Sequence, residues 1–140
     1  MTEQERRQLV RIGQELAVMV NGNPNGIYAY AEVRDMFMSA GVYQDEGNRV
    51  AYYTPKHDFA EAVEDLWHLR TQEERWGAMR YEIVDGEFSV EFDYPDQFDP
   101  NEDEDVRQER ALKARYGDKP IYYPPPEDWS ELIEADLSEE

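Results

Sequence analysis

Carboxylates are the side chains in this sequence whose number and spacing could do chemistry. Residues 85–109 contain eleven Asp and Glu but a single basic residue. Carboxylates can pair with Arg and Lys, bind cations, or act as a catalytic acid and base. Residues 85–140 carry a net charge of −14, against −5 for residues 1–84. This field repels nucleic acid and anionic membranes and attracts a strongly basic protein.

Cation binding and catalysis are less well supported than protein binding. The run from Asp99 begins like a calcium loop, but Glu104 stands where glycine is needed and Arg110 where a bidentate Glu is needed. There is no cysteine, and neither His57 nor His68 has metal-ligand spacing. No nucleophile has a plausible activating base, and no phosphate loop is present. We therefore predict no metal site, no cofactor and no enzyme activity; a small hydrolase or sugar-binding enzyme built on carboxylates is the third hypothesis.

Several of the acidic residues fall on predicted ordered elements rather than in a tail. Glu87, Glu91 and Asp93 share one face of a predicted strand, and four consecutive acids occupy the first turn of a predicted helix, where they suit the helix dipole. An ordered array of carboxylates can imitate phosphate spacing. The predicted contact residues, which we name the acidic flank, are Glu87, Glu91, Asp93, Asp96, Asp99, Glu102, Asp103, Glu104 and Asp105.

A β-hairpin over residues 79–94 must position the first part of this flank. Asp85-Gly86 is typical of a type I′ two-residue turn, and apolar residues alternate with polar ones on both sides of it. The turn fixes the register, with Ile83 opposite Phe88, and places the apolar side chains of both arms on one buried face. The carboxylates of the second arm then lie on the other face.

The remaining elements indicate an α+β domain. Helices are predicted over residues 2–21, 58–74 and 101–116, with capping boxes at Thr2/Glu5 and Asp58/Glu61 and a cap at Asn101. Strands are predicted over 27–33 and 49–54; residues 36–43 and 121–123 are ambiguous. We expect an antiparallel sheet of about four to five strands, packed against helices on one face.

One domain is expected, because 140 residues with 40% hydrophobic side chains suffice for a single core. It should span residues 1–126, followed by an acidic tail over 127–140 that is able to form a short helix. The chain shows neither a signal peptide nor a membrane-length apolar run, so a cytoplasmic location without membrane binding is predicted. Seven of the ten tyrosines exceed the needs of a small core, and some should stay partly exposed, either as contact residues or as cover for the sheet edges: Tyr28, Tyr30, Tyr43, Tyr52, Tyr53, Tyr122 and Tyr123.

Residues 58–120 resemble the YezG-like family of bacterial immunity proteins. The resemblance is carried by Trp76 to Glu82, by Asp85 to Phe88, by Phe92 to Asp96, and by the Arg110 to Tyr116 segment followed by Lys119-Pro120. It implies a cytosolic antitoxin that binds a secreted or contact-delivered toxin, often a nuclease. It implies no catalytic residues.

Charge and resemblance together predict a bacterial immunity protein that neutralises a cognate toxin by one-to-one association. Nuclease domains are basic because they hold phosphates, so an acidic inhibitor can occupy that surface. The alternative is an acidic nucleic-acid mimic that regulates a host nucleic-acid-binding protein. Direct nucleic-acid binding is not expected. The sequence leaves open whether the toxin's active site or a neighbouring surface is bound, and also the oligomeric state.

Overall fold

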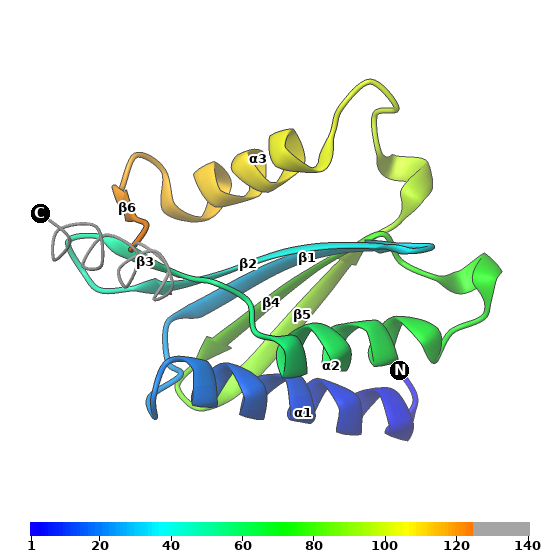
Figure 1. Ribbon diagram of the computed structural model, residues 1–140, viewed down its shortest axis with the longest axis horizontal. Coiled ribbons are helices and arrows are strands. Elements are labelled where there is room, and N and C mark those ends of the chain that lie inside the picture. Colours follow the sequence, from blue (N-terminus) through cyan, green and yellow to red (C-terminus); the bar gives the residue numbers. More distant parts are fainter. Residues whose placement is uncertain (125–140) are drawn as a thin grey trace, which may run out of the picture.

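A computed structural model describes residues 1–124 of the chain. Within these residues, three α-helices and a six-stranded sheet form the fold (Figure 1). The elements in chain order are α1 (Glu3–Met19), β1 (Ile27–Arg34), β2 (Phe37–Asp45), β3 (Val50–Tyr53), α2 (His57–His68), β4 (Ala78–Val84), β5 (Glu87–Asp93), α3 (Glu104–Tyr116) and β6 (Ile121–Tyr122). Two short 3-10 turns, η1 (Gln72–Glu74) and η2 (Pro95–Gln97), lie in the connections.

The predicted α+β class is confirmed, and the sheet is mostly antiparallel. Its strand order is β5-β4-β1-β2-β3-β6, and the one parallel pair is β3 with β6. The ambiguous segment 36–43 belongs to β2, which returns along β1 after a tight turn. Residues 121–122 add the sixth strand, because Lys119 binds Asp45 through its Nζ at 3.0 Å from both carboxylate oxygens and so holds the chain against the β3 edge.

The hairpin register is as predicted. Ile83 lies opposite Phe88, and Arg80 lies opposite Glu91. Asp85 and Gly86 have φ angles of 52° and 79°, the left-handed values that a type I′ turn requires at both central positions. The Gly86 amide also donates a 2.8 Å hydrogen bond to Asn25 Oδ1, which ties this turn to the loop before β1.

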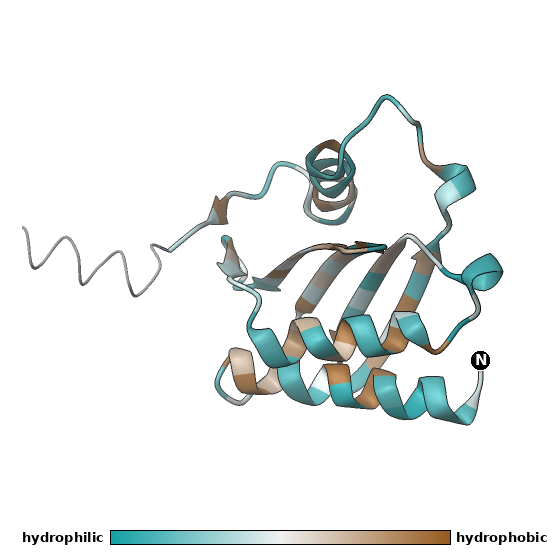
Figure 2. Ribbon diagram, turned by 45° about the vertical axis from the view of Figure 1, so that its right-hand side comes forward, coloured by the Kyte–Doolittle hydropathy of each residue, from teal (hydrophilic) through white to brown (hydrophobic). Residues whose placement is uncertain are grey.

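Helices α1 and α2 cover one face of the sheet with an apolar layer (Figure 2). Leu9, Ile12 and Leu16 line the buried side of α1, at the helical spacing seen in the sequence. Helix α1 approaches strand β4 closely at Gly13, where an added Cβ would lie 2.7 Å from Tyr81 Oη. Tyr81 in turn donates a 2.8 Å hydrogen bond to the Leu9 carbonyl. The predicted Thr2/Glu5 capping box is present.

Helix α3 covers the opposite face of the sheet, so the expectation of helices on one face does not extend to it (Figure 1). The reason lies in β1, a central strand that is buried on both sides from Ile27 to Val33. Its alternate residues Tyr28 and Tyr30 pack in a second cluster with Leu112 and Tyr116 of α3. The imperfect alternation of this strand in the sequence is therefore the pattern of a strand covered on two faces.

Both ends of α2 and the cap of α3 differ from prediction. Helix α2 begins at His57 with Lys56 at the cap and no side-chain capping bond, so the Asp58/Glu61 box is wrong. It ends at His68 rather than 74, because Trp67 Nε1 donates a 2.8 Å hydrogen bond to the Trp76 carbonyl and closes a short loop. Helix α3 is capped by Asp103, not Asn101.

The domain predicted over residues 1–126 is described to residue 124. The acidic tail predicted at 127–140, with its short helix, lies outside the described residues. None of the helices in residues 1–124 has the length and apolar character that crossing a bilayer needs.

Candidate functional site: the acidic flank

Three consecutive segments carry the acidic flank: β5, the η2 turn and the start of α3. The register places the β5 carboxylates on the face that α3 covers, because Ser89 lies opposite Glu82, and Glu82 lies opposite Tyr28. Strand β5 is at the edge of the sheet, so its acids remain at the periphery of the α3 layer. The acidic flank thus begins on the edge strand β5 and continues through η2 to the start of α3.

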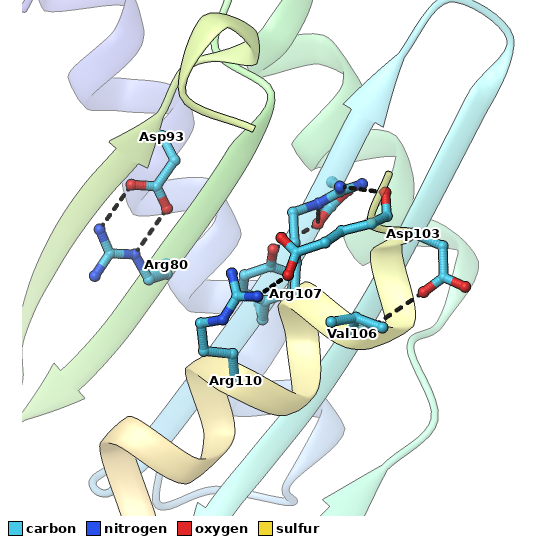
Figure 3. A network of polar contacts seen from close by, with 9 residues as sticks. Arg80, Asp93, Asp103, Val106, Arg107 and Arg110 are labelled. Carbon is cyan, nitrogen blue, oxygen red and sulfur yellow. Dashed lines mark hydrogen bonds and ion pairs between the residues drawn. The ribbon is translucent and has the colours of Figure 1, made fainter. Parts of the chain in front are cut away.

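Arg80 neutralises part of the β5 array. Its guanidinium donates to both oxygens of Asp93, at 3.1 and 3.0 Å, and lies 3.1 Å from a Glu91 oxygen (Figure 3). Burial lowers the pKa of Arg80, but the hydrogen bonds and charge of Asp93 outweigh this and leave it raised. Asp93 is therefore a structural partner of Arg80, while Glu91 keeps most of its surface in solvent.

The η2 turn and the loop that follows it present Asp96 and Asp99 at the surface. Asp99 accepts a 2.9 Å hydrogen bond from the Asn101 amide and so shapes its own loop. The segment is held down by Phe98, which packs so closely on Gly77 that an added Cβ there would lie 2.9 Å from the Phe98 ring. The exposed carboxylate of Asp96 thus stands on an anchored turn.

Two of the four consecutive acids at the start of α3, residues 102–105, form contacts within the chain. Asp103 caps the helix and accepts a 3.0 Å hydrogen bond from the Val106 amide. Glu102 forms an ion pair with Arg110, and its carbonyl accepts a 2.9 Å bond from Arg107 (Figure 3). Glu104 and Asp105 lie in the first turn, where negative charge complements the helix dipole.

A buried ion pair holds α3 on the sheet. Arg107 donates through Nε and Nη2 to the two oxygens of Glu32, both at 2.8 Å, and the two side chains are only 11% and 6% exposed. Tyr30 completes the site by donating its hydroxyl proton to Glu32 Oε2 at 2.5 Å. Burial, followed by the hydrogen bond and charge of Glu32, raises the pKa of Tyr30.

Sequence analysis did not single out this ion pair, although one signal for it was present. Glu32 interrupts the otherwise apolar strand β1, and a charge in a buried strand needs a partner. Arg107 is the one basic residue in the acidic stretch 85–109. The distance of 75 positions between them gives no local pattern that could join them.

Grooves lie on both sides of α3. One, of about 320 Å³, lies between α3 and β4 and is lined by Asp93, Asp99 and Glu102 together with Arg80, Arg107 and Arg110. The other, of about 860 Å³, lies between α3 and the β2–β3–β6 end of the sheet. Its walls include Tyr43, Tyr52 and Tyr123, and Tyr43 Oη accepts a 2.6 Å hydrogen bond from Gln108.

The structure separates the nine flank residues into two groups. Asp93, Asp99 and Glu102 meet in the first groove, and Glu91 joins Asp93 through Arg80. Among the nine flank residues, the carboxylates with neither an ion pair nor a hydrogen bond within residues 1–124 are those of Glu87, Asp96, Glu104 and Asp105. These four remain available to an external cation.

A different group of side chains is the nearest to a metal-ligand arrangement among the described residues. His57, Asp58 and Glu61, at the start of α2, bring donor atoms within 4.8 Å of one another. All three are exposed, and His57 Nε2 lies 3.5 Å from Glu61 Oε2. Side chains one helical turn apart contact each other without an ion between them, so we interpret this exposed group as a surface contact and not as a metal site.

The tyrosines divide between core and surface. Tyr28, Tyr30 and Tyr43 are buried, whereas Tyr122 and Tyr123 at the β6 end are exposed. The exposed pair lies at the sheet edge opposite β5 and so does not belong to the acidic flank.

Comparison with known proteins adds no assignment to this geometry. No protein-family model matches the sequence, and no curated protein matches it.

Proposed function

We propose that this protein is an immunity protein that binds a basic toxin domain, of nuclease type, one-to-one through the acidic flank. The observation that carries the proposal is the set of four unpaired carboxylates of the acidic flank, at Glu87 of β5, Asp96 of η2, and Glu104 and Asp105 of α3. Their charge is not spent on internal ion pairs, so it is available to steer a cationic partner and to pair with its Arg and Lys.

The internally paired acids support this function in another way. Arg80 and Arg110 hold the carboxylates of Asp93 and Glu102 in place. These two ion pairs do not cancel the negative charge of the flank, because its nine acids outnumber the arginines that pair with them. The resemblance of residues 58–120 to YezG-like immunity proteins points to the same class of partner and remains a prediction.

Binding would block a nuclease by competition. A nuclease surface that holds phosphates has the charge and spacing that an ordered row of carboxylates complements. The association should therefore be fast at low ionic strength and should slow steeply as salt is added. Nucleic acid and the immunity protein would then exclude one another from the toxin.

The test uses the full chain as bait to recover its binding partner, followed by co-expression. The proposal expects a basic protein that is toxic alone and harmless when co-expressed. The charge-reversal variant Glu87→Lys/Asp96→Lys/Asp105→Lys should bind at least about tenfold more weakly and with a flatter salt dependence. A matched control, Asp58→Lys/Glu61→Lys/Glu64→Lys on exposed positions of α2, changes the total charge equally and should bind nearly as tightly as wild type.

Two results would overturn the proposal. Equal affinity and salt dependence of the two reversal variants would remove the acidic flank from recognition. Recovery of a host nucleic-acid-binding protein that is not toxic would favour the nucleic-acid mimic instead.

A further inference from the structure

Strand β5 has an open backbone edge. Among the described residues it pairs with β4 alone, and it is seven residues long, whereas β6 at the opposite edge of the sheet has two. The residues that flank a two-residue turn form a hydrogen-bonded pair, and such pairs alternate along an antiparallel ladder. Glu87, Ser89 and Glu91 therefore direct their backbone groups to β4.

The intervening residues Phe88, Val90 and Phe92 then direct their N–H and C=O groups away from the sheet. Outside the strand ladders, no backbone hydrogen bond in residues 1–124 involves any of these three residues. The edge is thus a row of unused donors and acceptors, which is the template on which a further strand can form.

A largely apolar groove, which Arg6 and Gln14 also line, runs beside this edge on the α1 side. It has a volume of about 700 Å³ and lies between α1 and the β4–β5 hairpin. Val10 and Ala17 of α1 and Phe88 and Val90 of β5 contribute to its walls. Val10 is 44% exposed, and Phe88 and Val90 are half-buried, so the helical layer stops short of the edge strand.

The opposite side of the same edge is acidic. Glu87 and Glu91 project on the α3 face of β5, and Glu87 has no ion-pair partner within the described residues. The edge therefore offers an apolar wall on one side and carboxylates on the other, with backbone groups between them.

We propose that β5 binds an extended segment of a basic protein as a seventh strand of the sheet. Apolar side chains of that segment enter the groove between α1 and β5, and its alternate Lys or Arg side chains face Glu87 and Glu91. Backbone hydrogen bonds form along Phe88, Val90 and Phe92. The proposal rests on the proposed function for the positive charge of the partner, and it adds the conformation in which the partner is held.

A second copy of this chain is a poorer occupant of the edge. Antiparallel pairing of two β5 strands about Val90 would set Glu87 opposite Asp93 and Ser89 opposite Glu91. Pairing about Glu91 would set that carboxylate against itself. Like charges opposite one another destabilise a strand pair, and such charges protect edges from self-association. A basic segment turns the same charges into an attraction.

The experiment titrates the full-length protein with a peptide of alternating lysine and valine, matched to β5 in length and blocked at both ends. Two control peptides have the same side chains. One groups all its lysines before its valines, and the other carries N-methyl groups on alternate backbone amides so that its edge cannot donate. The alternating peptide should bind at least about tenfold more tightly than either control.

Hydrogen exchange locates the contact. Bound alternating peptide should slow exchange of the Phe88, Val90 and Phe92 amides by about tenfold or more, and should leave amides of β3 unchanged. Val90→Pro removes the central outward N–H without touching the β4 ladder and should weaken binding by about tenfold. Val90→Ala, which keeps that N–H, should bind more tightly than Val90→Pro. Circular dichroism checks that both variants fold.

Equal affinity for all three peptides would overturn the proposal, because charge alone would then explain binding. The N-methylated peptide gives this answer even if Val90→Pro does not fold. Failure here is distinguishable from failure of the proposed function. A toxin bound normally by Val90→Pro but lost with the charge-reversal variant would contradict only the seventh strand. Peptide binding at β5 without any neutralised toxin would contradict only the immunity function.

Discussion

The two faces of the sheet are covered by different kinds of contact. On the α1–α2 face, alanine, valine and aliphatic helix residues form a continuous apolar cluster. On the α3 face, β1 presents Tyr28, Tyr30 and Glu32. Helix α3 packs on this face with an arginine and with only two buried apolar side chains, Leu112 and Tyr116. One face is held by area that is removed from water, and the other by directed hydrogen bonds and charges.

The two faces therefore have different roles: one supplies folding free energy, and the other fixes the position of α3. Apolar burial stabilises without regard to direction, so the α1–α2 face can supply most of the folding free energy. A buried ion pair adds little net stability compared with apolar side chains of similar volume, but it leaves a large penalty for any arrangement that breaks it. We infer that Arg107 and Glu32 fix where α3 lies, and with it the carboxylates at the start of that helix.

The largest effect is expected from a cavity on the α1–α2 face. Phe59 of α2 is fully buried, and Phe59→Ala should lower the free energy of unfolding by about 3–5 kcal/mol. Leu112→Ala on α3 should cost only about 2 kcal/mol, because this residue borders an open groove that water can enter. Urea denaturation measures both. Equal losses would show that the two faces contribute alike.

The next effect comes from the ion pair under α3. Glu32→Gln leaves the Arg107 guanidinium buried without its charge partner and should cost about 3 kcal/mol in the same assay. The matched control is Glu82→Gln, which breaks the more exposed pair with Arg115 between the same helix and sheet and should cost less than about 1 kcal/mol. Glu32→Leu with Arg107→Met should recover most of the loss. If it does not, the pair contributes stability as well as position.

The sequence predicts the elements whose determinants are local. The turn at Asp85-Gly86 needs only two adjacent residues, and it sets every pair along β4 and β5. The Thr2/Glu5 box likewise depends on residues three positions apart. The strand pair β3–β6 and the face occupied by α3 could not be predicted in this way, because they depend on contacts between residues far apart in the chain, such as Lys119 with Asp45.

The acidic flank shows the same limit. Its location on a strand and a helix start followed from alternation and from helix-capping signals in the sequence. Which acids are free did not follow, because Arg80 reaches Asp93 across the hairpin and Arg110 reaches back to Glu102. The amino-acid composition gives the number of carboxylates. Which of them can bind a partner depends on the positions of the few arginines in the folded chain.

Alkaline pH should weaken the α3 face through Tyr28. Burial raises the pKa of Tyr28 to about 12 from its ordinary value of 10. Because the folded pKa is the higher one, the stabilisation is complete below pH 10 and is lost as pH rises through 12, up to about 3 kcal/mol. Tyr28→Phe should flatten the fall in unfolding free energy over this interval. Tyr122→Phe, which removes an exposed hydroxyl, is the control, and an identical slope in the two variants would contradict the assignment.

The smallest effect compares the two helix caps. Thr2 caps α1 and Asp103 caps α3, and replacing either by alanine should cost about 1 kcal/mol of helix stability. The two substitutions should speed hydrogen exchange in different elements. Helix α1 packs on a continuous core, whereas α3 has few buried apolar contacts and can open by itself. Asp103→Ala should therefore speed hydrogen exchange of α3 amides about fivefold and leave β1 amides unchanged.

Thr2→Ala should instead speed exchange of β1 and α1 amides together, since α1 opens only with its sheet. Asp103→Asn separates the cap from the charge, because asparagine keeps an accepting oxygen for the Val106 amide while losing the carboxylate. Exchange in α3 should then stay close to wild type while the acidic flank loses one charge. Faster β1 exchange in Asp103→Ala would mean that α3 and the apolar face unfold as one unit, and that position and stability are not divided between the two faces.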